Sequence, residues 1–144
     1  MEKYFNEITH SVPLYVTLGN HEGESGWNLN NTAENIAVWD TNERKKYFLN
    51  PAPDSFYSGD ATSYNFVGQR ESYYSWTWGD ALFVVLDVYR YQSKNADSDK
   101  PKGWDWTLGL TQYTWLKNTL EGSNAKYKFV FSHHVRGQDR GALT

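Results

Sequence analysis

The sequence predicts one domain of mixed α/β class, because apolar segments of strand length are interspersed with amphipathic helical patterns. Its 144 residues are enough to enclose a hydrophobic core. Strand-like segments lie at 14–18, 73–78, 81–87 and 127–132, and the clearest helical pattern covers 110–121. Two of these strands run directly into polar residues, which indicates where a functional site would lie.

The first elements are a short helix over residues 3–10 and a strand over 14–18. This strand leads into the turn Gly19-Asn20-His21-Glu22. Gly19 permits a backbone conformation that a side chain would obstruct. We expect Glu22 to anchor this turn.

Residues 24–70 contain no clear strand, and we interpret them as a long irregular insertion or lid within the domain. A helix is expected to start at 31–34, where Asn31 and Thr32 are good capping residues. Pro51 and Pro53 then end the helical pattern.

A β-hairpin is predicted from 73–78 and 81–87, joined by Gly79-Asp80. The second strand is apolar throughout, which favours burial on both faces. Thr111 is a plausible cap for the helix over 110–121. The strand over 127–132 follows and ends in His133-His134.

Composition excludes several classes of protein. The net charge of -3 and the charged fraction of 22% give no basic surface suited to nucleic acid. The absence of cysteine excludes disulfides and thiolate metal sites. No apolar run approaches the roughly 20 residues of a membrane span. Aromatic residues make up 17% of the chain, and they suit either a core or a ligand groove.

Polar residues therefore follow two strands, with Asn20 and His21 after the first and His133 and His134 after the last. In α/β folds, sites form just beyond the carboxyl ends of core strands. An amide oxygen with imidazoles suits borderline or hard divalent metals.

With these features in place, the chain resembles the calcineurin-like metallophosphoesterase superfamily, including its purple acid phosphatase branch. The matching segments occur in the family's order and are Gly19-Asn20-His21-Glu22, the hairpin from Tyr73 to Asp87, Gln112-Tyr113-Thr114-Trp115-Leu116, and Lys128 to His134. The resemblance implies a four-layer α/β/β/α sandwich. It also implies hydrolysis of a phosphate ester by a metal-bound hydroxide at a centre of two Mn, Fe or Zn ions.

Site roles follow from the resemblance by position. Asn20 and His133 would be ligands of one metal, and His21 would stabilise the transition state or protonate the leaving group. His134 is not assigned by the motif and is expected near the metal ligands without binding directly. The family's Asp-x-His and Gly-Asp are absent before Asn20, and its Gly-His-x-His is absent after His134.

We therefore expect residues 1–144 to be the central part of a single phosphoesterase domain, lacking its first and last motif-bearing parts. Such a fragment would have an incomplete ligand set, weak metal binding, negligible activity and exposed apolar edges prone to aggregation. The sequence leaves localisation open, although the family includes many exported enzymes.

Two other interpretations use the same sequence differently. The first is a non-enzymatic, aromatic-rich module that binds carbohydrate, and the second is a degenerate phosphoesterase-like scaffold. Arg44 and Arg70 are candidate substrate-binding residues, because guanidinium groups bind phosphate in a bidentate way. Solvation at the surface is the simpler expectation for both arginines.

Overall fold

The computed structural model describes residues 2–93 and 107–133, and this part of the chain has mixed α/β structure. The fold class predicted from the sequence is therefore confirmed at that level. The helices are α1 (Glu2–Thr9), α2 (Ile36–Tyr47) and α3 (Gly109–Gly122), with a 3-10 turn η1 (Gly26–Asn28). A four-stranded sheet has the order β1-β4-β5-β6, from β1 (Ser58–Gly59), β4 (Tyr74–Trp78), β5 (Ala81–Val85) and β6 (Tyr127–Phe131). Strands β2 (Ser63–Tyr64) and β3 (Gly68–Gln69) form a separate hairpin.

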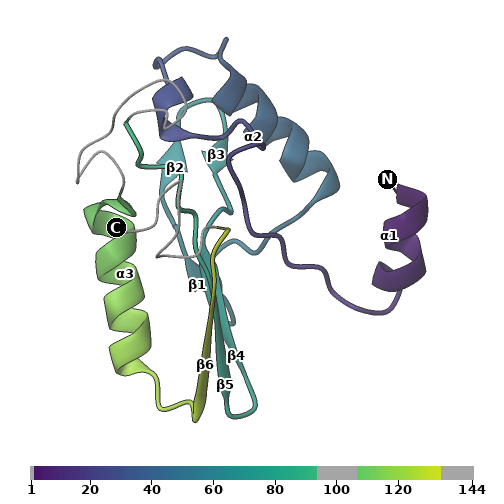
Figure 1. Cartoon of the computed structure of the whole chain (residues 1–144), viewed down its shortest axis with the longest axis vertical. Helices are drawn as coiled ribbons and strands as arrows, with labels where there is room; N and C mark the ends of the chain where they lie inside the picture. The colour runs from purple at the N-terminus through teal and green to yellow at the C-terminus, as the bar shows by residue number, and fades with distance from the viewer. Residues whose placement is uncertain (1, 94–106, 134–144) are drawn as a thin grey trace, which may run out of the picture.

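The predicted hairpin forms from β4 and β5, which pair antiparallel with Trp78 opposite Ala81. Only Gly79 and Asp80 remain for the turn. Gly79 has a φ of 59°, a left-handed conformation that glycine adopts without strain. Strand β6 then lies parallel to β5 on its other side, after a crossover that includes α3 (Figure 1).

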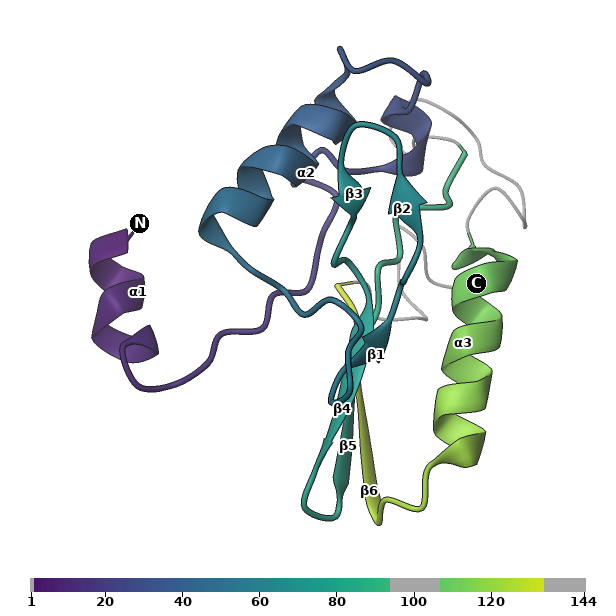
Figure 2. The same ribbon diagram turned by 180° about the vertical axis from the view of Figure 1, so that it is seen from behind.

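Helix α3 covers one face of this sheet, as Figures 1 and 2 show from opposite sides. Alternate β5 residues and the residue after the strand form the buried cluster Leu82, Val84 and Leu86. Partly buried side chains of α3 pack on it, namely Trp115, Leu116 and Leu120. Leu116 and Leu120 are four residues apart, so one side of α3 faces the sheet.

The opposite face of the sheet carries a ladder of stacked rings. Its neighbouring ring centroids are 4.1, 5.0 and 5.5 Å apart, in the order Tyr15, Trp76, Phe83 and Phe129. Phe129 is 46% exposed, and every residue of β6 is exposed. The prediction that the second hairpin strand is buried on both faces is therefore only partly correct. Phe83 lies on this less covered face and is only partly buried.

The strand predicted over 14–18 does not form, because its backbone groups pair with a side chain. The Asn50 amide donates to Val16 O and accepts from Val16 N, both at 3.1 Å. The Tyr74 hydroxyl also donates to Val16 O, at 3.1 Å. The segment is held in place against the sheet without entering a ladder.

The predicted start of α2 and the predicted cap of α3 are wrong. Helix α2 begins at Ile36, because Asn35 is the cap and its Oδ1 accepts from Val38 N at 3.1 Å. Helix α3 begins at Gly109, so Thr111 lies inside the helix and caps nothing. Instead, Thr107 Oγ1 accepts from Gly109 N at 3.1 Å.

Residues 24–70 are more ordered than an irregular insertion. They include η1, α2, β1 and the β2–β3 hairpin, which lies beside α2 in Figure 2. Whether the segment acts as a lid stays a prediction. None of the helices in residues 2–93 and 107–133 has the length and apolar character needed to cross a membrane.

Candidate functional site

Asn20 and His133 lie together, although 113 positions separate them in the sequence. Asn20 follows the extended segment that is held by Asn50, and His133 follows β6. Their nearest polar atoms are His133 Nε2 and Asn20 Oδ1, which are 3.2 Å apart. The sequence hypothesis that these two side chains share a site therefore has a matching juxtaposition in the fold.

Gly19 is required at this site because the His133 ring packs directly on it. A Cβ at position 19 would lie 2.6 Å from His133 Cε1 and 2.9 Å from Glu22 Oε2. Gly19 is not among the described residues whose φ lies in the left-handed region. Close approach of the imidazole, and not the unusual backbone conformation expected from the sequence, explains the glycine.

Glu22 and His21 occupy the same turn and have different surroundings. Glu22 Oε2 accepts from Gly19 N at 2.5 Å, which is the anchoring contact expected of this residue. His21 is exposed, and no hydrogen bond joins its ring to the described part of the chain. The imidazole of His21 is therefore accessible to a bound molecule.

The spacing of the donor atoms of Asn20 and His133 fits a single metal ion. Two ligands of a tetrahedral zinc, each about 2.0–2.1 Å from the ion, are about 3.3 Å apart. The observed 3.2 Å is close to that value, and it is also the length of the hydrogen bond that joins the two side chains in this structure. However, residues 2–93 and 107–133 contain no group of three or more His, Asp or Glu side chains that could hold a metal. The donor types and spacing of this pair fit one ion.

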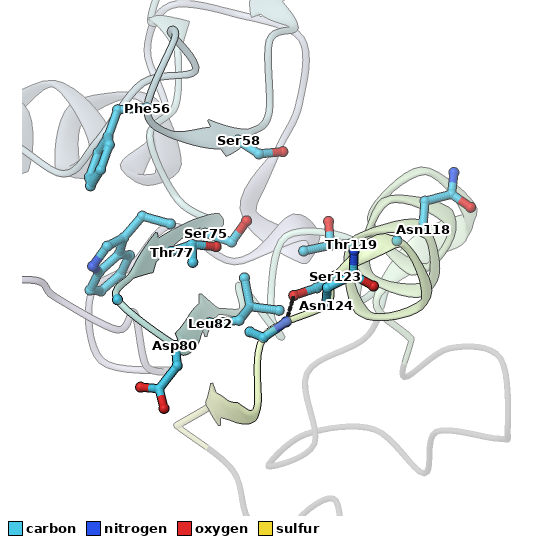
Figure 3. Close-up of a pocket in the computed structure, with 14 residues that line it drawn as sticks. Phe56, Ser58, Ser75, Thr77, Asp80, Leu82, Asn118, Thr119, Ser123 and Asn124 are labelled. Carbon is cyan, nitrogen blue, oxygen red and sulfur yellow. Dashed lines mark hydrogen bonds between the residues drawn. The ribbon is translucent and has the colours of Figure 1, made fainter.

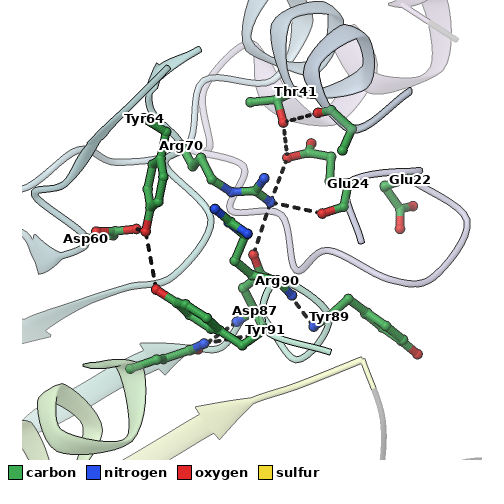
Figure 4. Close-up of polar contacts among 12 residues, drawn as sticks. Glu22, Glu24, Thr41, Asp60, Tyr64, Arg70, Asp87, Tyr89, Arg90 and Tyr91 are labelled. Atoms are coloured by element: carbon green, nitrogen blue, oxygen red, sulfur yellow. Dashed lines mark hydrogen bonds and ion pairs between the residues drawn. The ribbon is translucent and has the colours of Figure 1, made fainter. Parts of the chain in front are cut away.

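A buried ion network lies beyond this turn, and Figure 4 shows its members Glu24, Thr41, Arg70 and Asp87. Glu24 is 3% exposed, and its carboxylate accepts from Arg44 Nε at 2.5 Å, Arg70 Nη2 at 3.3 Å and Thr41 Oγ1 at 2.8 Å. Arg70 Nη2 is also 3.4 Å from Asp87 Oδ2. Two arginines are thus balanced by two carboxylates away from water.

The expectation that Arg44 and Arg70 are solvated at the surface is wrong, since they are 8% and 2% exposed. Their ion pairs connect α2 and the end of the insertion to the segment after β5. Their direct contact with a substrate stays a prediction. The residue that sequence reasoning missed is Glu24, which joins both arginines. Glu24 gives no local sequence signal, because both arginines are far from it in the sequence.

Asp87 connects this network to the end of β5. Gln112 of α3 is fully buried and brackets Asp87, with Oε1 accepting from Asp87 N at 3.0 Å and Nε2 donating to Asp87 O at 2.7 Å. Asp87 Oδ1 in turn accepts from the backbone N–H of Tyr89 at 3.1 Å. The Tyr89 ring lies 6.0 Å from the His133 ring. Gln112 and Asp87 therefore fix the loop after β5, whose Tyr89 ring lies beside His133.

A tyrosine cluster adjoins the network at the β2–β3 hairpin. The Tyr64 hydroxyl donates to Asp60 Oδ2 at 2.8 Å and lies 3.2 Å from the Tyr91 hydroxyl (Figure 4). Burial, followed by these hydrogen bonds, raises the pKa of Tyr64. Arg90 lies over the Tyr64 ring, with its Cζ 4.7 Å from the ring centroid. Burial and the neighbouring Arg70 lower the pKa of Arg90. This cluster packs the insertion against the loop after β5.

His134, which the sequence predicts to lie near the metal ligands, is outside the described residues. Comparison with known proteins adds no assignment: no family model matches the chain, and no curated protein or solved structure is significantly similar to it.

Proposed function

We propose that this chain supplies one half of a metal-dependent phosphoesterase site. The observation that carries the proposal is the convergence of Asn20 Oδ1 and His133 Nε2 at 3.2 Å, at the ends of two segments distant in sequence. This pairing of an amide oxygen and an imidazole matches what the resemblance to calcineurin-like metallophosphoesterases implies. The spacing of the two atoms also suits ligands of one ion.

Each residue of the turn has a role in this proposal. Asn20 and His133 would hold one metal, and Glu22 would keep the turn closed through its bond to Gly19 N. His21 is exposed beside them and would donate a proton to the leaving group or stabilise charge on the phosphoryl oxygens. When bound, two divalent ions activate water and neutralise the charge of the phosphoryl group.

The finer fold assignment belongs to the same proposal. A four-layer α/β/β/α sandwich needs a second sheet packed on the face of the first sheet that is opposite its helices. Helix α3 covers only one face here, and the other presents the aromatic ladder with Phe129 and Phe131 about half exposed. This face is of the type that a second sheet would cover.

Two donors are too few for a dinuclear centre, so the proposal requires further ligands, including a bridging carboxylate, from outside residues 2–93 and 107–133. The expected activity is that of the parent enzyme, and the 144-residue chain itself would be nearly inactive. A degenerate scaffold without the missing ligands is the alternative outcome.

Hydrolysis of p-nitrophenyl phosphate and its diester tests the proposal. The 144-residue chain should be compared with the product of the complete coding sequence, each with Mn²⁺, Zn²⁺ or Fe³⁺. We expect activity only in the longer protein, with a loss of about 100-fold or more in kcat for His21→Ala. Asn65→Ala, an exposed change in the β2–β3 turn, is the control. A longer protein that is inactive with every metal would contradict the proposal.

A further inference from the structure

A groove of about 790 Å³ opens at the end of the sheet that is opposite the Asn20–His133 pair. It lies between β4, the β4–β5 turn and the carboxyl-terminal end of α3, as Figure 3 shows. Asp80 of the turn precedes β5, whereas His133 follows β6, and these two strands are parallel. The groove is therefore separate from the candidate metal site. Its volume lies in the range of about 300–1,000 Å³ that is usual for small-molecule sites.

The strand side of the groove is set by the alternation of β4. Ser75 and Thr77 lie opposite Val84 and Leu82 in the register, so they share the sheet face that α3 covers. Ser58 of β1 pairs with Ser75, and its Oγ accepts from Trp115 Nε1 of α3 at 2.8 Å. This bond spans from sheet to helix and fixes the width of the groove at that point.

The helix side carries amides and a hydroxyl. Asn118 and Thr119 come from the last turns of α3, and Asn124 follows the helix (Figure 3). Ser123 Oγ accepts from Ala125 N at 3.2 Å, which holds the chain as it leaves the helix. The polar groups of the groove therefore belong to a strand, a helix and a hydrogen-bonded turn. Such rigid elements are the support expected of an organised site.

The lining selects against several ligand classes. Among the described residues, no lysine, arginine or histidine lines the groove, and Asp80 adds a negative charge. A phosphate or carboxylate ligand would thus meet repulsion and no cation. One carboxylate is also too few for a metal site. An apolar ligand would bury the hydroxyl and amide groups without partners, which is costly.

We propose that this groove binds an uncharged saccharide. Hydroxyl and amide side chains both donate and accept hydrogen bonds, which matches the dual character of sugar hydroxyl groups. Asp80 would accept from two neighbouring sugar hydroxyls. Phe56, which is 47% exposed, supplies apolar surface for the C–H face of a sugar ring. The site does not depend on the phosphoesterase proposal.

The test is titration of the ¹⁵N-labelled 144-residue chain with uncharged tetrasaccharides of glucose, mannose, xylose and N-acetylglucosamine. We expect at least one to bind saturably with a Kd of about 1 mM or tighter. Shifts should centre on Thr77, Asp80 and Asn118. Asp80→Ala and Asn118→Ala should each weaken binding by about 5- to 10-fold, because each removes hydrogen bonds of a small site. Asn65→Ala, an asparagine outside the groove, should leave the Kd unchanged.

Circular dichroism of each variant separates loss of the site from loss of the fold, and Asp80→Ala, at an exposed turn residue, is the safer of the two changes. The proposal is overturned if no uncharged saccharide causes saturable shifts up to about 20 mM. It is also overturned if inorganic phosphate or an extended peptide, and no sugar, shifts the groove signals, or if both variants bind as tightly as the unchanged chain.

Discussion

Replacing Glu24 by Gln should destabilise the fold far more than the loss of a carboxylate at the surface. The substitution keeps the size of the side chain and one acceptor oxygen. It removes the charge that faces Arg44 Nε at 2.5 Å and Arg70 Nη2 at 3.3 Å, and it introduces an amide donor among guanidinium donors. Asp87, 3.4 Å from Arg70, would then be the only carboxylate of the network for two buried arginines.

The magnitude follows from the burial of this network, in which Glu24 is 3% exposed. Removing one partner of a buried ion pair costs about 3–5 kcal/mol, because a charge is left without compensation. Domains of this size have a total free energy of unfolding of about 5–15 kcal/mol. With a urea dependence of about 2 kcal/mol per M, the midpoint should fall by about 2 M.

Urea unfolding followed by circular dichroism and tryptophan fluorescence measures this change. Glu43→Gln is the matched control, because Glu43 pairs with Lys46 at the surface, where the two side chains are 57% and 61% exposed. Its midpoint should stay where it is, since exposed pairs add little to stability. A midpoint for Glu24→Gln equal to that of Glu43→Gln would refute the reasoning about the network.

Three further predictions concern the site, the tyrosines and the sheet edge. Gly19→Ala should displace the His133 ring, because the new Cβ would lie 2.6 Å from His133 Cε1. The NMR resonances of His133 should shift far more than in the control Gly122→Ala, where a Cβ meets nothing within 4 Å. Equal His133 shifts in the two variants would contradict the close packing. Burial and the hydrogen bond to Tyr57 raise the pKa of Tyr15 to about 12 from 10.0. The resulting stabilisation is full below pH 10 and is lost as the pH rises from about 10 to 12, because the unfolded phenol ionises first. Burial also raises the pKa of Tyr64, Tyr73 and Tyr74, so several phenols should titrate late in the absorbance at alkaline pH. Tyr15→Phe should remove the component near pH 12, and an unchanged titration would count against this assignment. Phe131, 45% exposed on β6, should promote self-association, so Phe131→Lys should lower the apparent mass in sedimentation, whereas a monodisperse monomer of the unchanged chain would disprove this expectation.

The β4–β5 hairpin, α3 and β6 follow from local patterns, and the sequence predicts them closely. Gly79-Asp80 between apolar runs indicates the turn, and the spacing of Leu116 and Leu120 indicates the buried side of α3. The strand prediction for 14–18 is wrong because a strand needs a neighbouring strand to pair with. The Asn50 side chain, 34 residues from Val16, bonds the Val16 backbone instead, and no local pattern reveals this contact.

The candidate site is predictable in its residue types and not in its support. Asn20 and His133 could be named from the sequence because they match motif positions at the ends of apolar segments. The network around Glu24 could not, since its partners Arg44 and Arg70 are 20 and 46 residues away. Likewise, the need for Gly19 comes from a ring that is brought close only by the tertiary fold.

The central claim is that Asn20 and His133 are ligands of one metal in an incomplete site. Titration of the ¹⁵N-labelled chain with Mn²⁺ tests it most directly, because this ion broadens the signals of nuclei near it. We expect broadening centred on Asn20 and His133, with weak affinity of about 1 mM, and its loss in both Asn20→Ala and His133→Ala. Broadening elsewhere that neither substitution changes would contradict the site. Micromolar binding abolished by His133→Ala would contradict its incompleteness.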